Sequence, residues 1–314
     1  MATMTETPAA NSATKSAPPS HEYHADAHVL SGHLKRPIEQ TIEQHAPVSL
    51  KGRRSGHLTR MADGVSIEGL VTFAKGHTRV SGSKSTKPGH GWVTLSTSVL
   101  EGLNVFEIIT ADRLVSQVST EHPEEGGHFP HVTFLGTQFH NLKVSGIPLK
   151  LKLNYGICGA KPAGDNSYLD DLGFLGRVKD QTVQVLRGNG LPNDVKDSYD
   201  KRLTEIERLI SNKGSNCSGK PDSPPSVICS LISEIDKNIE KEIEGVKVFG
   251  HVLYIPDFGS VSLGEVTVGE RWYEPSDKKP ANYFELTVIN MNLGCVGTGN
   301  LKGGTAANNG HHNP

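Results

Sequence analysis

The sequence has 314 residues with 32 basic and 34 acidic side chains, which gives a formal net charge of −2. This near balance excludes a general basic field that would attract nucleic acid or acidic membranes. Aromatic residues make up only 6% and apolar residues 35%, while glycine reaches 34 residues, which favours many short strands over a large helical core.

The first 47 residues contain two kinds of segment. Residues 1–20 are rich in Ala, Ser, Thr and Pro and are expected to be disordered. They show neither the basic nor the apolar region of a secretory signal peptide, which favours a cytoplasmic location. In residues 21–47, an N-terminal arm, apolar and polar residues alternate from Tyr23 to Val29, which favours a strand ending before Pro37.

Residues 48–158 have the pattern of the first half of a β-domain. Asp63-Gly64 is a strong turn dipeptide, so a hairpin is predicted around it. Further strands are predicted at 92–97 and 104–120. No run in the chain approaches the roughly 18 apolar residues that a membrane-spanning helix needs.

The clearest hairpin pattern lies between His131 and Asn154. Leucines alternate with polar residues in its second half, so apolar groups would occupy one face. Ser145-Gly146 provides the turn, because glycine tolerates the positive φ of a tight turn. Pro148 cannot donate to a strand ladder, which predicts an edge position.

Helical spacing replaces strand alternation in residues 159–245, which we interpret as an insertion of three helices. The first is predicted at 166–188 and the second at 193–212, the latter with a regular apolar stripe and Asn193 as its N-cap. The third is predicted at 226–245, where isoleucines recur at helical spacing: Ile228, Ile232, Ile235, Ile239 and Ile243.

Strand alternation returns at 246–296, the second half of the β-domain, and the Gly/Asn/His-rich tail at 297–314 is expected to be disordered. The predicted fold is therefore mainly β, an antiparallel sandwich-like domain with a three-helix insertion, and α+β overall.

Four strand-and-turn segments carry a family resemblance: IITADRLVSQVS at 108–119, FHNLKVSG at 139–146, GEVTVGE at 264–270 and FELTVINMNLG at 284–294. They resemble bacterial choice-of-anchor P β-proteins, an uncharacterised family. The resemblance covers about a third of the chain and implies extracellular, non-catalytic β-structure. The chain departs from that family in its helical insertion and in having neither a signal peptide nor a C-terminal anchor.

The strongest candidate for chemistry is the loop that carries His122, His128 and His131. Histidine and carboxylate side chains bind Zn²⁺, and this loop also contains two glutamates, so it is the candidate zinc site. The alternative interpretation is an exposed acidic loop, because 15 histidines scattered along the chain produce such groups by chance. No phosphate-binding, dinucleotide-binding or hydrolase motif occurs, and no catalytic residue is assigned.

Weaker candidates lie elsewhere in the chain. One is a second histidine group at residues 21, 24 and 28, and another is the pair Asp112-Arg113. Basic residues Lys51, Arg53, Arg54 and Arg60 lack the interleaved aromatic residues of a nucleic-acid site. Four cysteines allow two disulfides, Cys158–Cys295 and Cys217–Cys229, or four free thiols in a reducing compartment.

The sequence favours a non-enzymatic structural or binding β-module without a cofactor. Its partner would be another protein or a second copy in a homo-oligomer, joined by β-strand addition through the segments 1–47 and 297–314. The alternative function is a metal-dependent hydrolase that uses the His122–His131 loop and zinc.

Overall fold

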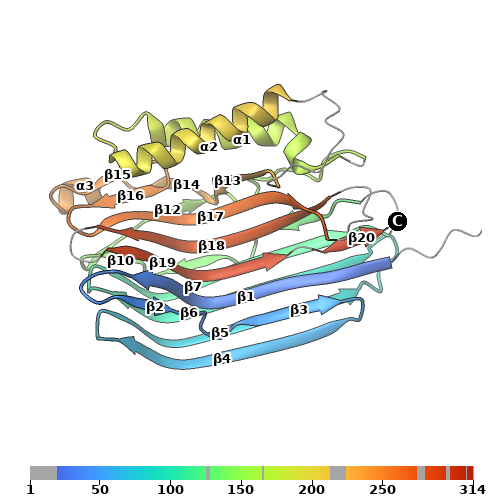
Figure 1. The fold of residues 1–314 in the computed structure, drawn as a ribbon, viewed down its shortest axis with the longest axis horizontal. Helices are drawn as coiled ribbons and strands as arrows, with labels where there is room; N and C mark the ends of the chain where they lie inside the picture. Colours follow the sequence, from blue (N-terminus) through green and yellow to red (C-terminus); the bar gives the residue numbers. More distant parts are fainter. Residues whose placement is uncertain are drawn as a thin grey trace, which may run out of the picture.

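The computed structural model describes residues 20–124, 128–164, 166–212, 224–273, 280–294, 298–308 and 310–313. Two antiparallel sheets pack face to face, and a pair of helices lies along one side of them (Figure 1). The predicted fold class, mainly β with a helical part, is confirmed.

The ten-stranded sheet contains the two ends of the described chain and its last third. Its main path is β15 (Lys247–Phe249), β16 (Val252–Ile255), β17 (Gly259–Arg271), β18 (Ala281–Leu293), β19 (Gly299–Asn308), β1 (Ser20–Leu34) and β2 (Gln40–Ile42). Three further strands join this path: β13 (Ser226–Ser230) pairs with β17, while β3 (Val48–Gly52) and β20 (His311–Asn313) pair with β1.

The eight-stranded sheet is built around a meander of long strands. Its main path is β11 (Ile147–Pro148), β10 (Lys143–Val144), β7 (Ile109–His122), β6 (Trp92–Val105), β5 (Val71–Lys84) and β4 (Gly56–Ile67). Two short strands, β8 (His131–Thr133) and β9 (Gln138–His140), pair with β7. A separate ladder joins β12 (Leu151–Leu153) to β14 (Ile232–Ile235).

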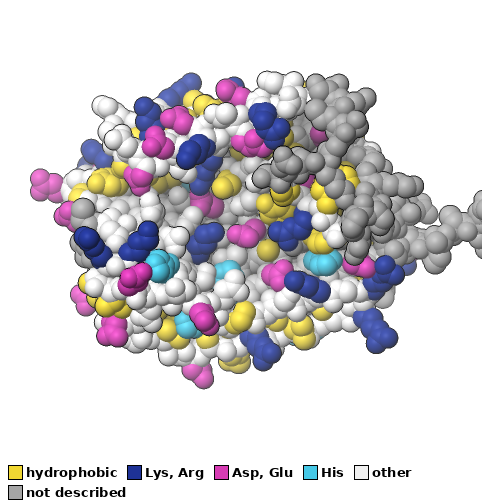
Figure 2. Space-filling model, in the orientation of Figure 1, with side chains coloured by type: hydrophobic (Ala, Val, Ile, Leu, Met, Phe, Trp, Pro, Cys, Tyr) yellow, Lys and Arg dark blue, Asp and Glu magenta, His cyan; other side chains and the backbone are white. Residues whose placement is uncertain are grey.

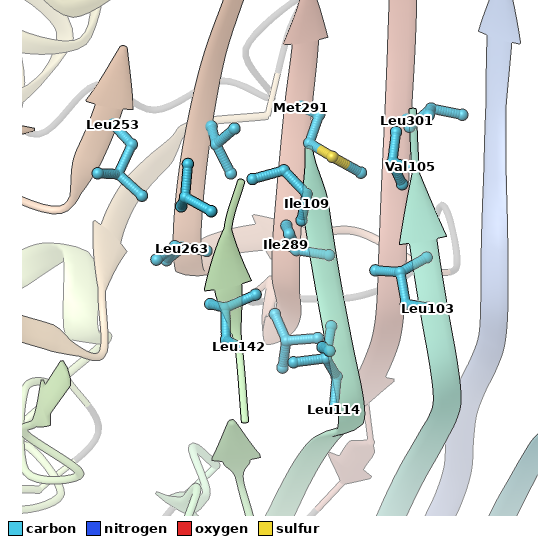
Figure 3. Close-up of a cluster of buried hydrophobic side chains, with 14 of the residues drawn as sticks. Leu103, Val105, Ile109, Leu114, Leu142, Leu253, Leu263, Ile289, Met291 and Leu301 are labelled. Atoms are coloured by element: carbon cyan, nitrogen blue, oxygen red, sulfur yellow. The ribbon is translucent and has the colours of Figure 1, made fainter. Parts of the chain in front are cut away.

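The main core fills the space between the two sheets. Leu103 and Leu114 of the eight-stranded sheet lie within the same cluster as Ile289, Met291 and Leu301 of the ten-stranded sheet (Figure 3). Burying apolar side chains in this core stabilises the fold by roughly 25 cal/mol for each Å² of apolar surface removed from water. Each sheet has an apolar inner face that the other sheet covers. Each sheet therefore needs the other in order to be stable.

Both sheets share an irregularity that runs across their long strands. Inward-facing residues lie two apart along most of each strand but three apart at one place. In the eight-stranded sheet these places are Ala62/Val65, Phe73/Gly76, Leu100/Leu103 and Ala111/Leu114. In the ten-stranded sheet the corresponding places are Ala27/Leu30, Leu263/Val266, Leu286/Ile289 and Gly303/Ala306, and Val29 and Val288, inside two of these intervals, also contribute to the core.

The register stays the same on both sides of this irregularity, so neighbouring strands reverse their alternation together. Gly102, Gly264 and Gly304 lie in these rows with φ values of 65°, 60° and 61°, which glycine adopts without strain. Because a slip of one residue moves side chains to the opposite face, a neighbouring strand must carry a matching irregularity to pair along its whole length.

The helices follow the sequence prediction for the first two segments. The short 3-10 helix Tyr168–Asp170 precedes α1 (Leu172–Leu186), and α2 (Asn193–Ser211) packs beside α1 against β13. The N-cap of α2 is Pro192 rather than the predicted Asn193, which is the first helical residue. Within the described segments, no helix is both long and apolar enough to cross a bilayer.

The prediction of a long third helix at 226–245 is wrong. Residues 226–230 and 232–235 form β13 and β14, and only α3 (Ile239–Glu242) is helical. The isoleucines come from two separate strands, because β13 ends at Ser230 and β14 begins at Ile232. The break between the strands shifts their alternation, and the combined spacing resembles that of a helix. β-branched isoleucine and valine in these segments favour strands, and pairing with β17 and β12 decides the outcome.

Three other predictions need correction. Residues 299–308, expected to be disordered, form β19 in the interior of the ten-stranded sheet. Asp63-Gly64 lies inside β4 at the irregular row, and the turn comes instead at Glu68 and Gly69, which both have positive φ. The predicted hairpin at Ser145-Gly146 exists but joins strands of only two residues, because Leu151–Leu153 pairs with β14.

Candidate functional site

The candidate functional site is the edge strand β4, which pairs with β5 on one side and with no other described strand. It is 12 residues long, and most of its residues are exposed. Leu58 is 44% exposed and Met61 is 77% exposed, so two of the four large exposed apolar side chains of the described chain lie on this strand. Figure 1 shows β4 at the lower border of the molecule.

The unpaired side of β4 presents backbone N–H and C=O groups that can pair with another strand. Among the described strands, those at the other borders of the two sheets are much shorter. β2, β11 and β15 have three, two and three residues, and β3 and β13, each paired with one neighbour, have five. A long edge strand without a covering element is the feature that natural β-proteins usually avoid unless it serves association. Among the described strands, β4 therefore leaves the most backbone groups free for pairing with another strand.

The histidines of the predicted zinc loop lie in three different environments. His122 ends β7 and is fully buried, the Nε2 atom of His128 lies 3.0 Å from the Pro280 carbonyl oxygen, and His131 is exposed at the start of β8. Glu125, between them, lies outside the described residues. Within the described ranges, no three His, Cys, Asp or Glu side chains converge as metal ligands.

The structure brings together one histidine from each of the two predicted groups. The rings of His21 and His122 have centroids 4.7 Å apart, and both side chains are buried. His21 also stacks on Trp92 at 5.5 Å and meets Tyr23 edge-on at 4.8 Å. This cluster packs one end of the sandwich, whereas His24 and His28 lie apart from it, with His28 bonded to Ser31.

The other weak candidates make local contacts. Arg53 forms an ion pair with Glu22 at 2.7 Å, and Asp112 accepts a hydrogen bond from Asn141 at 3.0 Å. Arg113 lies 3.6 Å from Glu101 across the neighbouring strand. Exposed pairs of this kind contribute about 0–1 kcal/mol, and none of them assembles a reactive site.

Cys158 and Cys229 are neighbours in a buried apolar cluster, both as free thiols. A hydrogen bond between the two thiols and burial raise the pKa of Cys158 well above its ordinary value. The sequence had placed these two cysteines in different candidate disulfides, with Cys295 and Cys217 as partners. Those two partners lie outside the described residues.

A buried polar network that sequence reasoning missed lies between α2 and the ten-stranded sheet. Arg202 donates to Glu265 at 2.8 Å, and Asn290 donates to the other oxygen of Glu265 at 2.7 Å. Burial alone would raise the pKa of Glu265, but Arg202 and Asn290 together hold it below its usual value. The Tyr199 hydroxyl lies 2.7 Å from Nε2 of His251.

The groups of this network keep fixed protonation states, so they hold α2 to the sheet in one arrangement. Burial raises the pKa of Tyr199, so the phenol stays protonated, and its ring lies 4.4 Å from the Arg202 guanidinium. Burial also lowers the pKa of His251 to about 4, so the imidazole is neutral at physiological pH. Strand alternation did not reveal the network, because its members come from α2, β17, β18 and a turn.

The neutral His251 predicts acid sensitivity. Its folded pKa of about 4 lies below the unfolded value of 6.5, so the unfolded chain binds the proton first and stability falls as the pH drops through this window. The expected loss from this group between about pH 7.5 and about pH 5 is roughly 2 kcal/mol. His251→Gln should reduce the pH dependence by that amount in urea unfolding at both pH values, and an unchanged pH dependence would contradict it.

One comparison with known protein families gives a match. A family model described as "Domain of unknown function (DUF8256)" matches residues 21–269, which run from β1 into β17. No curated protein and no solved structure matches the chain.

Proposed function

The chain belongs to this family of unknown function, and we propose that it is a non-enzymatic β-module that self-associates by strand addition at β4. The observation that carries the proposal is the length of this unpaired edge: 12 residues that pair on one side only. Two copies would join their eight-stranded sheets edge to edge through main-chain hydrogen bonds.

The irregular row across the eight-stranded sheet supports a second copy as the partner. The core-facing side chains of β4 are the even-numbered residues up to Ala62 and the odd-numbered residues from Val65 on. A regular strand paired with β4 could therefore keep its own apolar face toward the core along only one half of β4. A second β4, antiparallel to the first, carries the same irregularity. A dyad axis at this row would pair residues 60–67 of the two copies with their faces matched, and such a two-fold contact closes on itself.

The described parts of the two terminal segments are already paired within the fold. β1 pairs with β19 over nine registered positions, and β19 pairs with β18 on its other side. Both strands are therefore part of the fold and cannot leave it without breaking the ten-stranded sheet. Among the described residues this favours β4 over the terminal strands for strand addition.

A charge placed on β4 should weaken the association. Met61 is 77% exposed, so Met61→Lys should leave the fold intact while placing a charged side chain on the free edge, as natural edge strands do to block pairing. Sedimentation velocity over a range of concentrations should show a dimer for the unaltered protein. For Met61→Lys the dissociation constant should rise about tenfold, which corresponds to about 1.4 kcal/mol.

Leu135→Lys is the matched control, because Leu135 is 73% exposed and lies in a turn outside β4. It introduces the same charge and should leave the association unchanged. A protein that stays monomeric at every concentration would contradict self-association and leave a strand of another protein as the partner. A dimer equally insensitive to both substitutions would place the contact elsewhere.

A further inference from the structure

The outer face of the ten-stranded sheet carries two transverse rows of polar side chains. Ser262 pairs with Asn290, Asn290 with Lys302, and Lys302 with Ser31; the second row is Ser260, Asn292, Asn300 and His33. Neighbouring members of a row are about 4.8 Å apart, the spacing of strands. The rows form a grid of amide and hydroxyl groups.

α2 rises beside this grid and turns part of it into a groove. One hollow of about 270 Å³ lies between Asp194, Ser198 and Arg202 of the helix and the serine and asparagine residues of the two rows. A second hollow of about 240 Å³ shares Asp194, Ser260 and Asn292 with the first and adds Tyr254. In Figure 2 much of the surface below the helices, in the left half, is white, the colour of the backbone and of side chains other than apolar, charged or histidine.

Two of the amides are held in fixed orientations by the protein. Asn290 donates its N–H to Glu265 at 2.7 Å, and Asn292 donates to Asp194 at 3.0 Å. In each case the amide oxygen makes no hydrogen bond within the described chain. Because an amide oxygen only accepts, a molecule that replaces water at these two positions would donate hydrogen bonds to them.

Other groups in the groove require the ligand to accept as well. Lys302 only donates, and the serine hydroxyls can do either. The charge of Arg202 is matched by Glu265, and Asp194 offsets Lys302, so the groove offers no strong field for an anion. Tyr254, which is partly exposed in the second hollow, adds apolar surface beside the polar groups, as is usual in ligand sites.

We propose that this groove binds a neutral oligosaccharide. Sugar hydroxyls donate and accept at once, as the amide oxygens and Lys302 require, and sugar C–H faces pack on apolar side chains such as Tyr254. Two adjoining hollows fit more than one sugar unit. The site lies on the sheet opposite to β4, so it does not depend on the proposed self-association.

The test is calorimetric titration of the full-length protein with cellohexaose, maltohexaose, xylohexaose and chitohexaose, beside trigalacturonic acid as an anionic probe. At least one neutral sugar should bind with a dissociation constant of about 1 mM or tighter. The double variant Asn292→Ala/Asn300→Ala should weaken that binding about tenfold, since it removes two hydrogen-bonding groups. Asn166→Ala, an exposed asparagine before the first helices, is the matched control and should bind like the unaltered protein.

Three results would overturn the proposal. One is a lack of binding by all four neutral sugars at about 10 mM, a concentration that would reveal even weak complexes. Another is binding by trigalacturonic acid alone, which would make the groove an anion site. The third is neutral-sugar binding that the double variant leaves unchanged, because it would place the site elsewhere. Thermal unfolding of each variant checks that the fold is retained.

Discussion

Removing residues 299–314 is expected to leave a protein that does not fold. These residues include β19, which lies between β18 and β1 inside the ten-stranded sheet. Their loss would expose the edges of both neighbours and remove Leu301 and Ala306, which are fully buried. The truncated chain should be insoluble or lack a cooperative unfolding transition in circular dichroism.

A point substitution tests the same strand without deleting it. Leu301→Ala should lower the free energy of unfolding by about 2 to 5 kcal/mol, because it leaves a cavity in the core. Leu58→Ala, on the exposed edge β4, should change it by less than about 1 kcal/mol. A soluble truncated chain with a cooperative transition would show instead that residues 299–314 are an appendage.

Arg202→Met is expected to destabilise the protein by about 3 to 5 kcal/mol, because it leaves the Glu265 carboxylate buried without its cationic partner. The second change Glu265→Gln should recover more than half of that loss. Asn290 can still donate to the glutamine oxygen, and no buried charge then remains. Urea unfolding of the two single variants and the double variant measures the coupling.

The matched control is Lys179→Met, which removes an exposed ion pair of the same 2.8 Å length between Lys179 and Glu207. Its cost should stay below about 1 kcal/mol, since exposed pairs are screened by water. An Arg202→Met variant no less stable than this control would contradict the account. It would mean that water or a proton replaces the arginine at Glu265 without cost.

The parts of the fold that could be predicted are those with large side chains at a regular period. The alternation from Tyr23 to Val29 predicted β1, and the apolar stripe of residues 193–212 predicted α2. β19 could not be predicted in this way, because its inward-facing residues include Gly303. A Cβ atom there would lie 2.9 Å from Ile289, so neighbouring side chains fill the space that a large residue would occupy.

The candidate sites were less visible in the sequence than the strands. The edge position of β4 depends on which strands pair, and no local pattern specifies that. The groove did leave a signal, since Ser260/Ser262 and Asn290/Asn292 are polar pairs two residues apart and therefore share a strand face. Only the register of β17 and β18 shows that these pairs lie side by side.

The two histidine groups also show that spacing in the sequence does not predict which side chains meet in the fold. Spacing within each group suggested a local site, yet the structure joins His21 to His122 across 101 positions of sequence. Their rings pack with Trp92 and Tyr23 at one end of the sandwich, where large side chains are needed to fill the core. Proximity in sequence was therefore a poor guide to proximity in the fold.

Hydrogen–deuterium exchange of the β4 backbone tests the central claim, strand addition at this edge, most directly. In an antiparallel edge strand, alternate N–H groups point away from the paired neighbour and exchange freely unless another strand covers them. We expect these outward amides of residues 60–67, the part of β4 that the dyad would pair, to become protected as the protein concentration rises, and to stay unprotected in Met61→Lys. Free exchange at these amides in a protein that is nevertheless dimeric would contradict strand addition at β4.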